Sequence, residues 1–299
     1  MQKPDPKRAI SHAICLNGQC FVDQDSQAAM ISVTDRGLLL GDGLFETLPI
    51  LNGHALWWER HQKRLVKSAN EIGLPLDTKQ ITESVKKLCE ISQGSNSILR
   101  VTVTRGSGGR GLLPAPNQSP TILASLAPLP ANLAYQEAKL ITCNIRRNEQ
   151  SPTSRIKSLN YLDNILASQE AERHGADDAL MLNTCGMATC STIGNLFAVF
   201  GNQIVTPPIS DGVLPGILRG QLLEHSSKWG HELSEDSLTS DQLKKADGLF
   251  LTNSLRIMRR VIQLDGRIFT RRDAPEDLIS NLQARMNTLI SIETGITLA

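Results

Sequence analysis

The chain has 299 residues, of which 40% are apolar and 20% are charged, and its formal net charge is +1. This length is enough to bury one full core or two smaller ones. A charge so close to zero gives no electrostatic reason to expect nucleic acid or an anionic membrane surface as a partner. The composition therefore points to a globular protein with a small-molecule ligand.

Targeting and redox signals are both weak. The opening string MQKPDPK lacks the apolar core of a signal peptide, and no later segment is long and apolar enough to cross a bilayer. We expect a cytoplasmic protein with no membrane span. Its cysteines show neither a CxxC pair nor the histidine spacing of a zinc site, so we expect mostly buried thiols and no disulfide framework or metal cluster. They are Cys15, Cys20, Cys89, Cys143, Cys185 and Cys190.

The first half of the chain predicts an α+β domain over residues 1–127. Alternating apolar runs indicate strands, and Asn17-Gly18 is typical of a hairpin turn. Helical spacing of apolar residues follows, and Asp77 is positioned to cap the second helix. The strands are expected at residues 13–16, 20–22, 30–33, 98–104 and 121–126, and the helices at 57–72 and 78–91.

Prolines at 128 and 130, with Asn132, break the pattern and predict a linker over residues 128–134. A second, larger α+β domain is expected over residues 135–299. Its strands are expected at 140–145, 179–182, 196–199 and 249–252, and its helices at 159–174, 218–227 and 276–290. A ligand is expected in the cleft between two such halves.

Three strings carry the chemistry: RGSGGRG at 105–111, SRIKSLNYL at 154–162 and LPGILR at 214–219. On spacing alone, Lys157 before an amphipathic helix would be a solvated surface group. Together, however, the strings resemble the class-IV pyridoxal-phosphate enzymes, and the resemblance runs from residue 15 to residue 261. It implies a two-domain fold-type-IV structure, pyridoxal 5'-phosphate as cofactor and a homodimer. It also makes Lys157 the catalytic lysine that bonds to the cofactor aldehyde, which requires a desolvated amine.

The same resemblance predicts how the cofactor phosphate is bound. The glycine turn before the helix at 218 offers the amides of Ile217 and Leu218. The string TNSL at 252–255 resembles a second phosphate loop, which includes Ser254 and Leu255. Arg64 matches the family arginine that pairs with the phosphate. Without the resemblance, Arg64 would be part of a basic helix face and Ser254 a turn residue.

Two residues are expected at the cofactor ring. Tyr161 resembles the tyrosine that contacts the ring hydroxyl in branched-chain enzymes, although a core aromatic fits equally well. Cys190 stands where the family places a glutamate that keeps the ring nitrogen protonated. A thiol donates only a weak hydrogen bond, so we expect a weakened electron sink. A thiolate paired with a protonated ring, a reaction that needs less of a sink, and a degraded enzyme are the alternatives.

The residues expected to bind the substrate predict the reaction. Arg110 resembles the family arginine that binds the substrate carboxylate, and the string around it, with Asn253-Ser254-Leu255, is most similar to aminodeoxychorismate lyase. D-amino-acid enzymes have a tyrosine and a histidine where Leu38 and Leu112 stand. Branched-chain enzymes have a tyrosine where Ile98 stands.

We therefore expect a 4-amino-4-deoxychorismate lyase of folate precursor synthesis that forms 4-aminobenzoate and pyruvate. An aminotransferase for D- or branched-chain amino acids is the alternative, and a non-catalytic relative is a further one. Leu38 and Arg256 are expected near the substrate. Arg256, Arg259 and Arg260 either meet extra substrate charge or form a solvated run.

Overall fold

The computed structural model describes residues 12–270 and 277–298. The chain divides into two compact units. Unit 1 comprises residues 1–131, 157–159 and 292–296, and unit 2 comprises 132–156, 160–291 and 297–299. Two segments that the sequence assigned to the second domain, 157–159 and 292–296, thus cluster with the first unit.

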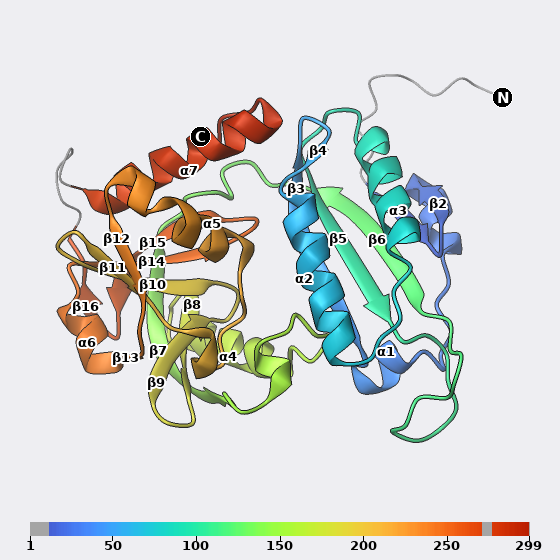
Figure 1. Cartoon of the computed structure of the whole chain (residues 1–299), viewed down its shortest axis with the longest axis horizontal. Coiled ribbons are helices and arrows are strands. Elements are labelled where there is room, and N and C mark those ends of the chain that lie inside the picture. The colour runs from blue at the N-terminus through green and yellow to red at the C-terminus, as the bar shows by residue number, and fades with distance from the viewer. Residues whose placement is uncertain (1–11, 271–276, 299) are drawn as a thin grey trace. The chain divides into compact units, whose positions relative to one another are not determined.

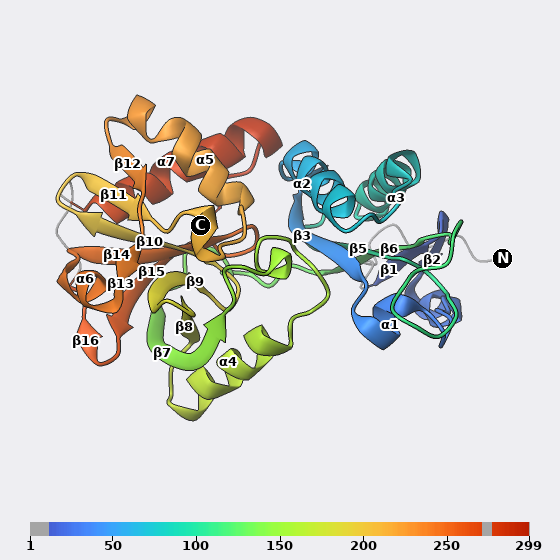
Figure 2. The same ribbon diagram turned by 60° about the horizontal axis from the view of Figure 1, so that its bottom comes forward.

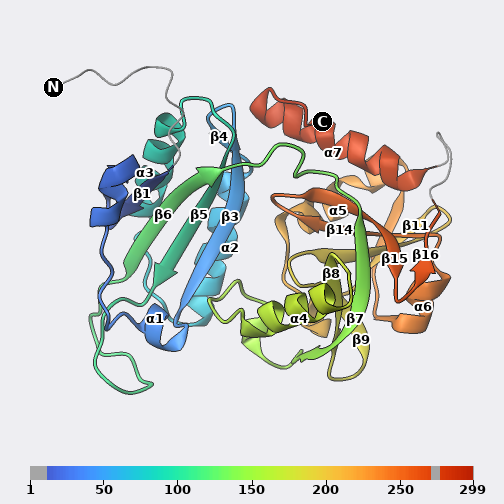
Figure 3. The same cartoon turned by 180° about the vertical axis from the view of Figure 1, so that it is seen from behind.

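Unit 1 is an antiparallel sheet with two long helices on one face (Figures 1 and 2). Figure 3 shows the opposite face, along which β6, β5 and β3 run side by side. The strand order is β2-β1-β6-β5-β3-β4. The strands are β1 (Ala13–Leu16), β2 (Gln19–Val22), β3 (Gly43–Leu51), β4 (His54–Ala55), β5 (Ser97–Thr104) and β6 (Thr121–Pro128). The helices are α1 (Arg36–Leu40), α2 (Trp58–Glu71) and α3 (Thr78–Ile91).

Most of the predicted elements of this half are confirmed. The side chain of Asp77 accepts a hydrogen bond from the backbone N–H of Gln80 at the start of α3. Apolar side chains of the sheet and of the two helices meet in a buried core that includes Leu48, Leu65, Ile81, Leu88 and Leu99. The strand expected at residues 30–33 is wrong, because this segment is irregular and exposes Met30 and Val33.

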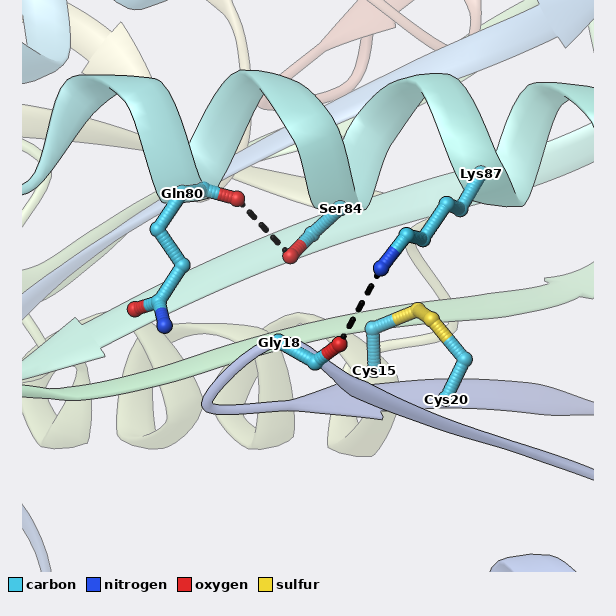
Figure 4. Close-up of a disulfide and its surroundings, with 6 residues drawn as sticks. All are labelled: Cys15, Gly18, Cys20, Gln80, Ser84 and Lys87. Carbon is cyan, nitrogen blue, oxygen red and sulfur yellow. Dashed lines mark hydrogen bonds between the residues drawn. A yellow bond between two sulfur atoms is a disulfide. The ribbon is translucent and has the colours of Figure 1, made fainter.

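The β1–β2 hairpin holds a disulfide that the sequence analysis did not predict. Cys15 and Cys20 face each other in register across the hairpin, and their sulfurs are bonded beneath α3 (Figure 4). Lys87 of α3 donates to the carbonyl of Gly18 in the turn at 3.3 Å. Spacing alone missed this pair, because residues five apart become neighbours only once the hairpin register is known.

Unit 2 is built on a ten-stranded mixed sheet that closes on itself. Six strands, in the order β10-β14-β15-β7-β8-β9, form a ring because β9 also pairs with β10. The strands are β7 (Ala138–Arg147), β8 (Asp178–Asn183), β9 (Met187–Ser191), β10 (Asn195–Phe200), β11 (Gln203–Thr206), β12 (Glu232–Glu235), β13 (Leu238–Thr239), β14 (Gly248–Asn253), β15 (Ile257–Leu264) and β16 (Arg267–Ile268). The helices are α4 (Leu162–Arg173), α5 (Ile217–His225), α6 (Ser240–Lys245) and α7 (Leu278–Thr294).

The helix expected at 159–174 is shorter and differently oriented than predicted. It begins at Leu162, and it buries Ala167 and Ala171. An amphipathic helix was expected to bury its apolar residues, but Leu162 and Ile165 are 66% and 51% exposed. None of the helices within the described residues is long and apolar enough to span a bilayer.

Candidate active site

The backbone around Lys157 is paired with the edge of β3 in unit 1. Phe45 donates its N–H to the carbonyl of Lys157 at 2.9 Å, and Leu159 donates to the carbonyl of Gly43 at 3.0 Å. A side chain at position 43 would come within 2.8 Å of Leu159 Cδ1, so glycine permits this close approach. Residues 157–159 thus form a short bridge to β3, a few residues before α4 begins.

The Lys157 side chain lies over an aromatic ring. Its Nζ is 4.2 Å from the centre of the Phe45 ring, and the guanidinium of Arg100 is 3.9 Å from the same centre. Lys157 is half-buried, and its charge lowers the pKa of His61 as a minor contribution. The amine therefore lies against the protein beside an apolar ring, which is the partly desolvated setting expected for it.

Glu46, the residue after Phe45 in β3, organises a buried cluster of charges. Arg64 of α2 donates to both of its carboxylate oxygens, from Nε at 2.8 Å and from Nη2 at 2.5 Å. His61, one turn earlier on α2, lies 2.7 Å from the same carboxylate through Nδ1. Sequence reasoning identified Arg64 but missed Glu46 and His61, because their contact depends on how α2 packs on β3.

Electrostatics fix the protonation of this cluster. Burial alone would raise the pKa of Glu46, but the charge of Arg64 and the hydrogen bonds from Arg64 and His61 outweigh it and lower that pKa to about 2. Burial lowers the pKa of His61 more than Glu46 raises it. His61 is therefore neutral at pH 7 and donates its Nδ1–H to an ionised carboxylate.

In unit 2, Asn195 holds the glycine turn before α5. Its Nδ2 donates to the carbonyl of Leu214 at 2.8 Å, and a side chain at Gly216 would come within 1.9 Å of its Oδ1. The turn leads into α5, so the amides of Ile217 and Leu218 lie in the first turn of the helix, where N–H groups have no intrahelical acceptor. The turn therefore offers the backbone donors that anion-binding sites use, and the predicted role of Ile217 and Leu218 stays a prediction.

The neighbouring strand β14 adds a polar atom to this region. Thr252 pairs in register with Asn195, and its buried Oγ1 has no hydrogen-bond partner among the described residues. The following loop is closed by Asn253, whose Oδ1 accepts from the amides of Leu255 and Arg256 at 3.0 and 2.7 Å. The Leu255 amide is thus engaged within the loop.

Cys190 lies where strands β9 and β10 meet. It is buried, pairs in register with Asn195, and has the Oγ1 of Thr189 3.6 Å from its sulfur. Tyr161 occupies the cap position before α4 in the same unit. Unit 2 therefore brings Cys190 and the glycine turn together through Asn195, while Lys157 and Arg64 belong to unit 1.

The comparisons with known proteins agree on one family. The model of the family Amino-transferase class IV matches residues 43–264. A protein of Methanocaldococcus jannaschii, provisionally named a branched-chain-amino-acid aminotransferase, is 34% identical over 268 residues, which cover 88% of this chain and 91% of that protein. The D-alanine aminotransferase of Bacillus licheniformis is 30% identical over 271 residues, covering 89% and 94%.

Among solved structures, the 4-amino-4-deoxychorismate lyase of Pseudomonas aeruginosa matches with a TM-score of 0.81 and 30% identity, over 92% of this chain and 98% of that one. The chain belongs to the class-IV aminotransferase family. It is accordingly an enzyme of the group that comprises pyridoxal-phosphate-dependent lyases and aminotransferases. The three relatives differ in activity at similar identity, so the family is shown and the substrate is not.

The donor set of this class-IV enzyme suits the family's cofactor. The amides at the start of α5 and the unpartnered Oγ1 of Thr252 suit a phosphate, and the half-buried amine of Lys157 suits an aldehyde. In unit 1, the nitrogens Nε and Nη2 of Arg64 are engaged with Glu46. A phosphate bound by Arg64 would therefore meet a guanidinium whose orientation is already fixed.

The predicted substrate residues lie in different settings. Arg110 is exposed on the loop between β5 and β6, and Leu38 is 69% exposed on α1. Nη1 of Arg256 donates to the side chain of Gln136 at 3.0 Å. The expectation of a solvated arginine run is wrong for Arg259 and Arg260, which are both buried. Arg260 is buried in an ion pair with Asp277, and buried Arg259 donates to the carbonyl of Glu137.

Replacing the carboxylate of Glu46 should destabilise unit 1. Glu46→Gln leaves Arg64 without a counter-charge, and breaking a buried pair costs roughly 3–5 kcal/mol in the free energy of unfolding. Because the folded-state pKa is about 2 against an ordinary 4.5, the wild type keeps this stabilisation above pH 4.5 and loses it as the pH falls toward 2. Between pH 7 and pH 3, the free energy of unfolding measured in urea should fall more in the wild type than in Glu46→Gln.

The control is Glu71→Gln, on the exposed face of α2. It should unfold like the wild type at both values of pH. Equal stability of Glu46→Gln and Glu71→Gln at pH 7 would contradict the assignment.

Proposed function

We propose that this enzyme is a pyridoxal-phosphate-dependent 4-amino-4-deoxychorismate lyase that forms 4-aminobenzoate and pyruvate. The observation that carries the proposal is the loop at 105–111, in which an exposed Arg110 is set among glycines in the arrangement most similar to the lyases. The match to the Pseudomonas lyase supports it. Apolar, exposed Leu38 and Leu112 replace the polar carboxylate trap of the D-amino-acid enzymes.

In this proposal the residues have separate tasks. When bound, the cofactor supplies an aldehyde that bonds to the substrate amine and a ring that withdraws electrons. The amide groups of Ile217 and Leu218, with Thr252 and Ser254, hold its phosphate. Arg110 binds a substrate carboxylate. The amine of Lys157 takes the proton from the substrate ring, and the C–O bond to the enolpyruvyl group breaks. The departing enolate takes up one proton at its methylene carbon to give pyruvate, which balances the proton lost from the ring.

Removal of the amine tests the proposal directly. Lys157→Ala should lose the covalent adduct that borohydride traps between wild-type protein and pyridoxal phosphate, measured by mass spectrometry of the intact chain. It should also lower the formation of 4-aminobenzoate and pyruvate by at least about 100-fold, the range of a removed acid–base group. Lys139→Ala, an exposed lysine of β7, is the control. A wild type that forms the adduct but no pyruvate would contradict the lyase and leave the cofactor assignment intact.

An aminotransferase is the second candidate, because relatives at 34% and 30% identity are named for that activity. Cys190 opposes it, since reversible transamination depends on a strong electron sink and a thiol supports one poorly. Aromatisation drives the lyase reaction and offsets a weaker sink.

A carboxylate at position 190 should shift the balance between the two activities. We expect Cys190→Glu to raise the rate at which an amino acid alone converts the bound cofactor to its amine form, by about tenfold or about 1.4 kcal/mol. The rate is followed by the cofactor's near-ultraviolet absorbance, and Cys190→Ser is the control. An unchanged ratio of transamination to pyruvate formation in Cys190→Glu would contradict the argument that Cys190 disfavours transamination by weakening the electron sink.

We also propose that the enzyme acts as a homodimer. The family resemblance supports this, and so do exposed apolar residues of unit 1 on α1 and on the loop between β5 and β6. Its exposed members are Leu38, Leu39, Leu40, Leu112 and Leu113. Light scattering should give twice the chain mass of 32.7 kDa for the wild type and a lower mass for Leu39→Asp. A monomeric wild type would contradict the proposal.

A further inference from the structure

The loop that carries Arg110 is held by a buried arginine from α1. Arg36 is 4% exposed, and its guanidinium makes three hydrogen bonds. Nη1 donates to the carbonyl of Gly111 at 2.9 Å, and Nη2 donates to the carbonyl of Leu112 at 2.7 Å. These acceptors belong to the two residues that directly follow Arg110.

The Nε–H group of Arg36 fixes the orientation of its guanidinium. Nε donates to Asp42 Oδ2 at 2.9 Å. Asp42 can reach back to Arg36 because α1 ends after a single turn at Gly41, whose φ of 67° is in the left-handed region that favours glycine. With one edge on a carboxylate and the other on two carbonyls, the planar fork has a single orientation.

The rest of the loop depends on this clamp. Among the residues that the structure describes, the hydrogen bonds that tie the exposed stretch 109–117 to other parts of the chain are the two from Arg36. Glycine at 108 lets the loop pass close to Arg36, since a side chain there would meet Arg36 Cδ at 3.1 Å and Gln118 Nε2 at 2.1 Å. The Arg110 side chain itself has no protein partner within the described residues.

We propose that Arg36 is the positioning residue for the substrate-binding loop, and that it acts through the backbone at 111–112 to set the direction of Arg110. This rests on the proposed role of Arg110 in binding a substrate carboxylate. Arg36 is buried, and its three nitrogens donate to Asp42, Gly111 and Leu112, so it does not bind substrate itself. Its contribution is to order the loop before the substrate arrives.

The chain supplies a matched control in Arg105. It is buried like Arg36, and its Nε donates to the same oxygen of Asp42 at 2.8 Å. Its other nitrogens, however, donate to the carbonyls of Ile72 and Gly73, at the end of α2. Lysine at either position keeps the charge and loses the fork, but only Arg36→Lys releases the loop at 111–112.

The first measurement does not depend on activity. Limited digestion with trypsin should cut the bond after Arg110 at least about tenfold faster in Arg36→Lys than in the wild type or in Arg105→Lys, as judged by mass spectrometry of the fragments. Tenfold corresponds to about 1.4 kcal/mol, the size of one hydrogen bond to a charged group. Equal cleavage in the two variants would overturn the proposal.

The second measurement connects the loop to the substrate. Arg36→Lys should raise the KM for aminodeoxychorismate about tenfold relative to the wild type, with kcat within a factor of three. A fall in kcat at unchanged KM would also overturn the proposal. If the wild type forms no pyruvate, the proposed function fails, and the trypsin comparison alone decides whether Arg36 holds the loop. Should Arg36→Lys not fold by circular dichroism, Arg36→Gln takes its place in both measurements.

Discussion

The pairing of residues 157–159 with β3 is the constraint on which the proposed chemistry of this enzyme depends. Two backbone hydrogen bonds join Lys157 and Leu159 to Phe45 and Gly43, so the lysine is fixed by a sheet rather than by a loop. The amine then lies beside the Phe45 ring. One strand thus supplies both the backbone and the apolar surface that a reactive amine needs.

Two carboxylates on or next to the same strand bind side chains from neighbouring elements. Glu46 follows Phe45 and binds Arg64 and His61 on α2, so the helix that carries the predicted phosphate arginine is fixed to the strand with which the Lys157 segment pairs. At the start of β3, Asp42 binds Arg36 and Arg105, which hold two different segments. Ionised carboxylates at positions 42 and 46 therefore organise the cationic residues of unit 1, and each arginine keeps one orientation because two or more acceptors define it.

The sequence predicted most of the fold because its signals were local. Period-two runs located the long strands, and helical spacing with the Asp77 cap located α2 and α3. Prediction failed where a contact with another segment of the chain determined the local structure. The apolar face of α4 is exposed at Leu162 although its periodicity indicated burial, and Cys15 meets Cys20 only through the hairpin register. In the candidate site, the motif residues could be named from the resemblance, but the groups that orient them could not, because Glu46, Asp42 and Asn195 act through contacts between distant segments.

If Cys190 faces the cofactor ring as proposed, it favours a reaction that is downhill by itself. The ring of strands in unit 2 closes at this residue through its pairing with Asn195, and the side chain of that same Asn195 supports the glycine turn. A glutamate here would have to keep an ionised carboxylate in a buried setting, which costs free energy unless a protonated partner balances it. A thiol avoids that cost and gives up the strong sink. Such an exchange is tolerable in an elimination driven by aromatisation, where the product supplies the driving force, and unfavourable in a reversible transfer of an amino group.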